Sequence, residues 1–172
     1  MSVLDRALRL ADRVRAPREA HAHCDIPCGI YDPHMAQVAA LTVVRMVQLI
    51  EALPAPAGGD KAAMDTYGMQ VSRYTAVKEE HAKICEHELV ILWSDYFKPE
   101  HVEKHPNLHD TFWKATKLTS TVKQAVNMDA SQQLLAACQQ IAEIFWDTKG
   151  VKTRRQASNQ GAAGGEFVYP TT

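Results

Sequence analysis

Residues 32–52 read DPHMAQVAALTVVRMVQLIEA, and this stretch decides the fold class. Asp32 followed by Pro33 is a strong helix-start signal, because proline suits the first helical turn, where its missing N–H is not needed. Apolar residues then recur at three- and four-residue spacing, which predicts an amphipathic helix over about 33–52. The apolar stripe consists of Val38, Leu41, Val44, Met46, Leu49 and Ile50.

Three further helical patterns follow a Pro/Gly linker, LPAPAGGD. The first is long and is stopped or redirected by Pro99, and the last is closed by Gly150, a residue favoured just after a helix. No alternating strand pattern is evident, and the Gly-, Ala- and Thr-rich segment 151–172 predicts a flexible, solvated tail. The three patterns cover about 60–97, 109–126 and 130–149, and the stretch PEHVEKHPNLHD (99–110) is expected to be a connector.

Four helices with short connections most simply form an antiparallel four-helix bundle, so the sequence predicts an all-α fold over 32–150. The chain has 172 residues, 46% of them hydrophobic, with 19 basic and 20 acidic side chains. This composition indicates one globular domain. It gives no reason to expect a membrane span or nucleic-acid binding, because there is neither a long apolar run nor a basic surplus.

Residues 1–22 have apolar side chains at helical spacing with arginines between them, and they end in Ala20-His21-Ala22. The small-x-small ending is typical of peptidase cleavage sites, but the continuous apolar run of a secretory signal is missing. Two interpretations stay open: a cleavable leader that is not an export signal, or an ordinary first helix and linker. Without an export signal, we expect a cytoplasmic protein.

Residues 23–31, HCDIPCGIY, form a compact segment that we call the hook. The thiols of Cys24 and Cys28 can converge on one soft metal ion, since thiolates select ions such as copper(I), zinc or nickel. Alternatively, the pair is a zinc-binding or thiol-redox module without catalysis. Cleavage after Ala22 would add the free amine of His23. Nickel(II) favours a square plane of ligands. Such a plane could then be formed by the His23 amine, the amide nitrogen of Cys24 and the two thiolates, and the His23 imidazole could reach an axial position.

Other candidate groups carry weaker signals. Cys85 and Cys138 lie within helical patterns, which is typical of buried packing residues. The connector histidines are either solvated or part of a site; they are His101, His105 and His109. The Glu-x-x-His pairs of di-metal carboxylate bundles are absent from the sequence.

The hook HCDIPCGIYDP resembles the processed amino terminus of the nickel superoxide dismutase family, and WSDYFKPEHVEKHP (93–106) and IFWDTK (144–149) are similar to its internal sequence. The resemblance covers about 23–150. It implies a four-helix bundle assembled as a homohexamer and matured by a peptidase that cuts between Ala22 and His23. It further implies disproportionation of superoxide by one nickel ion per chain, held by His23, Cys24 and Cys28.

The resemblance also assigns supporting roles. Tyr31 and Tyr96 would stand over the open face of the nickel and restrict access to it. Asp25 would orient backbone amides and Pro27 would shape the turn of the hook. Lys98 would attract the anionic substrate.

One departure from the family concerns the axial imidazole. The family pairs a glutamate of the first helix with an arginine of the second long helix beside that ring, and the matching positions here are Ala39 and His81. Replacing both partners together avoids leaving one buried charge unpaired. We therefore expect His81 to influence the His23 ring in place of the ion pair.

Cleavage changes the charge balance. Removal of residues 1–22 takes away five arginines and three acidic residues, which leaves 150 residues with a formal charge of −3. An acidic protein repels an anionic substrate overall, so fast capture requires local positive charge near the hook.

Overall fold

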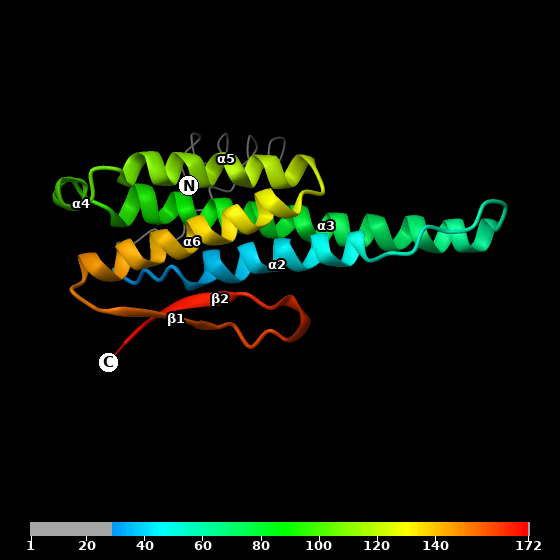
Figure 1. Cartoon of the computed structure of the whole chain (residues 1–172). Helices are drawn as coiled ribbons and strands as arrows, with labels where there is room; N and C mark the ends of the chain where they lie inside the picture. The colour runs from blue at the N-terminus through cyan, green and yellow to red at the C-terminus, as the bar shows by residue number, and fades with distance from the viewer. Residues whose placement is uncertain (1–28, 172) are drawn as a thin grey trace, which may run out of the picture.

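The computed structural model describes residues 29–171. The predictions for the leader and for hook residues 23–28 lie outside this range. The described part begins at Gly29 and contains four long helices and a short C-terminal sheet (Figure 1).

The predicted helices are confirmed, with ends within a few residues of those expected. The long helices are α2 (His34–Glu51), α3 (Lys61–Ile91), α5 (Leu108–Gln124) and α6 (Met128–Thr148). Between α3 and α5 lie a five-residue π-helix, Leu92–Tyr96, and the short helix α4, Pro99–Lys104. Side-chain oxygens cap two of these helices, because Asp60 accepts from the Ala63 N–H and Asn127 from the Ala130 N–H.

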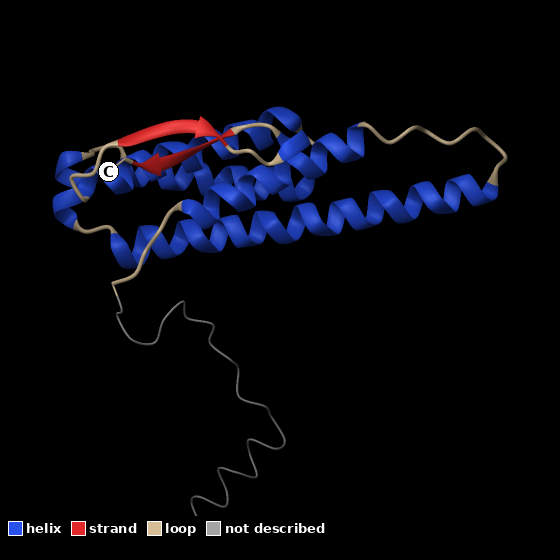
Figure 2. Ribbon diagram, turned by 90° about the horizontal axis from the view of Figure 1, so that it is seen from below, coloured by secondary structure: helices blue, strands red, loops and turns tan. Residues whose placement is uncertain are grey.

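The four long helices pack as a bundle in which α2 contacts α3 and α6, and α5 contacts α3 and α6. Phe112, Phe145 and Leu134 are among its fully buried side chains. Cys85 and Cys138 are also buried, with their sulfurs 3.5 Å apart, so both are packing residues as predicted. The first half of α3 and the 53–60 linker project beyond the other helices (Figures 1 and 2).

One buried charge joins α3 to α5. The ammonium of Lys78 is enclosed and donates to the carbonyls of Val122, Lys123 and Ala125, where α5 ends. These carbonyls lack partners within the helix, so a cation there satisfies them and favours the helix dipole. Burial lowers the pKa of Lys78 below its ordinary value of 10.5.

The predicted flexible tail at 151–172 is wrong. Strands β1 (Thr153–Ala157) and β2 (Glu166–Pro170) pair antiparallel, with Arg155 opposite Val168, and this C-terminal hairpin lies along α2 and α6 (Figure 2). Phe167 and Val168 are each 2% exposed. Two adjacent buried residues break the alternation expected of a strand with one buried face, which is why the periodicity gave no signal.

Polar side chains of the bundle hold the hairpin in register. The amide of Gln37 is buried and pairs twice with Val168: its Oε1 accepts from the backbone N–H (2.8 Å), and its Nε2 donates to the carbonyl (3.3 Å). Gln139 on α6 donates to the Glu166 carbonyl at 2.7 Å. Arg155 forms a two-pronged ion pair with Glu143, at 2.7 and 3.2 Å.

The turn before β2 approaches α2 closely. Gly165 has φ +75°, and a Cβ at this position would lie 2.9 Å from Cδ1 of Leu41. The backbone conformation therefore favours glycine, and any larger residue would also have to displace the end of the Leu41 side chain. None of the helices over residues 29–171 is long and apolar enough to span a bilayer.

Candidate functional site

The described chain begins at one end of the bundle, directly after the cysteines of the hook. Gly29 has φ +72°, a conformation that glycine adopts without strain, and Tyr31 follows it against the helices. The centroid of the Tyr31 ring lies 5.6 Å from that of Tyr96. The two tyrosines predicted to stand over the metal are therefore neighbours, although they are far apart in the sequence.

A π-helical turn positions Tyr96. The Phe97 N–H donates to the Leu92 carbonyl at 3.1 Å, five residues back, where α3 gives way to the connector. Such wide turns occur frequently at functional sites, because they redirect side chains at the end of a helix. Here the turn directs Tyr96 toward α6.

The hydroxyl proton of Tyr96 has a defined direction. Its oxygen lies 2.7 Å from Oγ1 of Thr148, and Thr148 donates its own hydrogen to the Phe145 carbonyl at 2.6 Å. A threonine hydroxyl has a single proton, so Tyr96 is the donor in the Tyr96–Thr148 bond. The lone pairs of the Tyr96 oxygen remain able to accept a hydrogen bond.

A residue that sequence reasoning missed covers the Tyr96 ring. The ammonium of Lys149 lies 5.5 Å from the Tyr96 ring centroid and 4.6 Å from that of Phe145. Both distances fall in the range of cation–π attraction. The His101 ring also stacks on Tyr96, with the two centroids 5.5 Å apart. Lys149 is the last residue of the IFWDTK segment, so its place in a segment similar to the family was the sequence signal that could have identified it.

A cavity of about 340 Å³ opens beside Tyr31, and we call it the mouth cavity. Its walls are mainly apolar and include Met35, Ile91 and Leu92, while Asp32 and Glu88 bring negative charge. Asp32 also stabilises the first turn of α2 by accepting from the His34 N–H at 2.7 Å. No lysine or arginine among the described residues lines this cavity, so cations that attract an anion must act from its surroundings.

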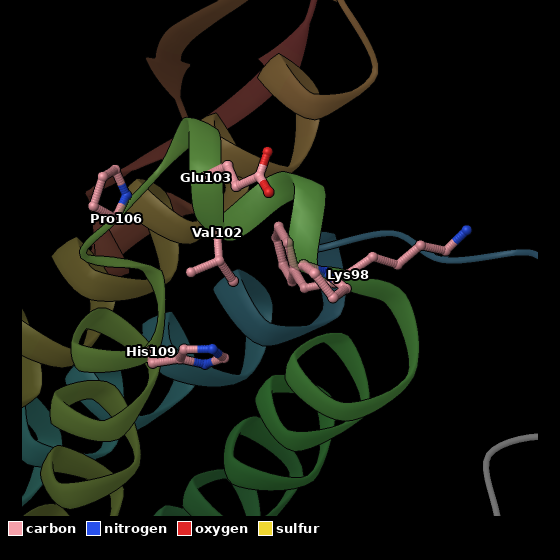
Figure 3. A pocket seen from close by; sticks show the side chains of 7 residues that line it. Lys98, Val102, Glu103, Pro106 and His109 are labelled. Atoms are coloured by element: carbon pink, nitrogen blue, oxygen red, sulfur yellow. The ribbon is translucent and has the colours of Figure 1, made fainter.

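Lys98, the cation that the sequence proposed for this role, lies on the connector. It borders a groove of about 590 Å³ formed with Phe97, Pro99 and Val102. Figure 3 shows Val102 and His109 pointing into this groove, whereas the exposed side chain of Lys98 extends away from it into solvent. Lys98 is therefore free to interact with ions approaching from solution.

The three connector histidines serve structural roles. His109 accepts a hydrogen bond from the indole of Trp93 at 2.8 Å, and Nδ1 of His101 accepts from the Lys98 N–H at 3.1 Å. His105 lies 2.9 Å from the carboxylate of Asp147. That carboxylate also contacts Lys104, whose hydrogen bond, with support from His105, lowers the pKa of Asp147.

The positions that depart from the family lie on facing helices. Ala39 is 2% exposed on α2. His81 is half-buried on α3, and its Nδ1 lies 2.9 Å from the Val77 carbonyl. A carbonyl only accepts, so Nδ1 carries the proton and Nε2 is left without one in the neutral ring.

The metal-ligand candidates His23, Cys24 and Cys28, with Asp25 and Pro27, lie outside the described residues. Over 29–171, no group of three or more His, Cys, Asp or Glu side chains is placed to hold a metal ion. The hook carries the candidate donors that the sequence identified. Its thiols are the donor type that binds soft ions such as nickel, and a free amine at His23 would complete a planar set, so the residues fit that metal.

Comparisons with known proteins point to the same chemistry. The family model described as nickel-containing superoxide dismutase matches residues 18–149. The chain is 38% identical to superoxide dismutase [Ni] of Streptomyces seoulensis over 141 residues, covering 81% of this chain and 98% of the relative. The corresponding protein of Streptomyces coelicolor is 37% identical over the same length and shares of both chains.

Solved structures agree in fold. A native nickel superoxide dismutase superimposes with a TM-score of 0.64 at 35% identity, over 74% of this chain and 99% of that one. A structure with nickel ligation corresponding to the oxidized state gives a TM-score of 0.65 at 36% identity, with the same coverage.

Proposed function

The chain belongs to the nickel-containing superoxide dismutase family, and we propose that His23, Cys24 and Cys28 build its metal centre once the bond between Ala22 and His23 is cut. The protein is an oxidoreductase that converts superoxide into dioxygen and hydrogen peroxide. When bound, nickel supplies the electron transfer by alternating between Ni(II) and Ni(III). The observation that carries the ligand proposal is the hook sequence itself, which supplies two thiols directly before the aromatic end of the bundle.

In this proposal the nickel would be held by the amine, and by the imidazole, of His23, by the amide nitrogen of Cys24 and by the thiolates of Cys24 and Cys28. Asp25 orients amides within the hook, and Pro27 shapes its turn. His81 influences the imidazole in place of the ion pair that Ala39 and His81 replace. These roles rest on the resemblance and on the residue types present.

The two tyrosines limit access and order water at the open face. The contact between the Tyr31 and Tyr96 rings, 5.6 Å apart, supports this role, since paired rings leave room only for small molecules. Because the Tyr96 hydroxyl donates its hydrogen bond to Thr148, the Tyr96 oxygen accepts a hydrogen bond from water and is not the immediate proton donor to the substrate. The lone pair of Tyr96 thus holds water in a fixed orientation.

Local positive charge draws the anion toward this end of the bundle. Lys98 extends into solvent, and Lys149 lies over the Tyr96 ring. These cations oppose the formal charge of −3 on the 150 residues from His23 onward. Electrostatic steering of this kind raises association rates and weakens with salt.

We further propose a homohexamer, a dedicated maturation peptidase and a cytoplasmic location. The family resemblance supports the first two. The third rests on the leader, which lacks the apolar run of an export signal. Light scattering of the purified protein measures the assembly, and any mass other than six chains would contradict the hexamer.

The amino terminus and metal content test the ligand proposal together. We expect intact-mass analysis of the native protein to give a chain starting at His23 with one nickel ion. Cys24→Ser and Cys28→Ser should each abolish nickel retention and superoxide consumption. Cys138→Ala is the matched control, because it removes a buried thiol outside the hook. Full activity in an uncleaved, nickel-free chain would refute the proposal.

A further inference from the structure

A cavity of about 270 Å³ lies between α2 and the C-terminal hairpin. Leu41 on α2 and Ala163, Phe167 and Tyr169 of the hairpin form its apolar walls. The hairpin follows the end of the family match at residue 149, so the family fold alone does not supply this cavity. Its walls combine apolar side chains with polar ones, including Thr42 and Gln160, and such a mixture can fix the orientation of a small molecule.

A cation without a carboxylate partner stands at one end of the cavity. Nη1 of Arg45 contacts only neutral oxygens, Oε1 of Gln48 at 3.1 Å and the Ala162 carbonyl at 3.5 Å. Among the described residues, no Asp or Glu pairs with Arg45 or lines the cavity. By contrast, Arg155 in the same hairpin is satisfied by Glu143. A half-buried guanidinium of this kind favours an anionic ligand, and carboxylates match its geometry.

An imidazole marks the other end. His34 lies eleven residues before Arg45 on the same face of α2, about 16 Å away along the helix axis. Its ring packs against Phe167 at 5.2 Å and Tyr169 at 5.5 Å. Nδ1 of His34 is buried and has no hydrogen-bond partner in the described part of the chain. The cavity is therefore an elongated slot with Arg45 and His34 at its ends and Val38, Leu41 and Thr42 of α2 between them.

We propose that this slot binds a small monocarboxylate with a slim apolar body. The carboxylate pairs with Arg45, and the apolar body lies between Leu41 and Phe167. Thr42 lines the slot one turn before Arg45, and its hydroxyl, which donates to the Val38 carbonyl at 2.9 Å, keeps lone pairs that accept from a water beside the ligand. The site uses none of the residues assigned to superoxide chemistry.

Titration with hexanoate tests the proposal, with hexanamide as a neutral probe of the same length. On the full chain, followed by calorimetry and by amide NMR shifts, we expect saturable binding of hexanoate at least tenfold tighter than that of hexanamide. Arg45→Gln should remove this preference and leave the two probes equal. The matched control is Arg154→Gln, which removes the same charge from an exposed position of the hairpin and should change neither affinity.

A second variant keeps the test independent of Arg45. Ala163→Leu adds bulk inside the slot and should weaken both probes at least tenfold, while an unchanged melting temperature shows that the hairpin is still docked. The proposal fails if hexanoate does not saturate the wild-type protein at millimolar concentration. It also fails if hexanamide binds equally well, or if Arg45→Gln and Arg154→Gln lower hexanoate affinity to the same extent.

Discussion

Phe167→Ala tests whether the C-terminal hairpin is a docked part of the fold. The Phe167 side chain is 2% exposed and packs edge-on against His34 at a centroid distance of 5.2 Å. Truncating a buried phenylalanine costs about 3–5 kcal/mol, because transfer energy is lost and a cavity remains. With a urea m-value of about 2 kcal/mol/M, the unfolding midpoint should fall by about 1.5–2.5 M.

Amide hydrogen exchange gives a local measure of the same effect. The Val168 N–H is bonded to the buried Gln37 side chain, so it exchanges only when the hairpin undocks or the protein unfolds. A loss of 3 kcal/mol should accelerate this exchange by about a hundredfold, at 1.4 kcal/mol for each factor of ten. Proteins should be compared at one protomer concentration, because assembly contributes to apparent stability.

The control is Arg154→Ala, at an exposed position of β1, which should change stability by no more than about 0.5 kcal/mol. The reasoning would be refuted if Phe167→Ala cost less than about 1 kcal/mol and the wild-type Val168 amide exchanged at the rate of an unstructured peptide. Segment 151–172 would then be the solvated tail that composition predicted.

Three further predictions concern charged groups. Lys149→Gln should lower kcat/KM for superoxide and flatten its dependence on ionic strength, whereas Lys152→Gln, beyond the ring cluster, should change both much less; equal effects would remove Lys149 from substrate capture. The lowered pKa of Asp147 stabilises the folded wild-type protein above about pH 3.8, and this contribution is lost as the pH falls below that value. Asp147→Asn lacks the contribution, so its free energy of unfolding, measured with urea, should fall less than that of wild type over this pH range. Because burial lowers the pKa of Lys78, the unfolded chain binds more protons than the folded protein just below pH 10.5. The free energy of unfolding of wild type should therefore rise with pH in this range relative to that of Lys78→Met. Parallel plots of unfolding free energy against pH for the two proteins would contradict this.

Helix periodicity predicted most of the fold, because apolar stripes and start signals report directly on which face of a helix is buried. The linker after α2 and the stop at Pro99 were visible for the same reason. The hairpin was missed because its buried residues Phe167 and Val168 are adjacent and do not alternate, and because the polar side chains Gln37 and Gln139 bond to its backbone from far along the chain. Counts of apolar spacing cannot detect such anchors.

The candidate site was also predicted only in part from the sequence. Sequence motifs identified Tyr31 and Tyr96, and the structure brings their rings together. The direction of the Tyr96 proton could not be predicted, since it depends on Thr148 and on the π-helical turn at Leu92–Tyr96. The roles of Lys98 and His81 stay predictions, and the ligands of the hook are tested only by the experiments above.

The position of the last strand has a practical consequence for preparing the enzyme. The ring of Tyr169 lies 5.5 Å from that of His34, and the Thr171 N–H donates to the Lys152 carbonyl, so the end of the chain is held beside the helix that follows the hook. A polyhistidine tag joined there would place many imidazoles, which themselves bind nickel, beside the start of α2, and we expect it to distort the measured nickel content. The 53–59 loop, at the opposite end of the bundle in Figure 1, is the better place for a purification handle.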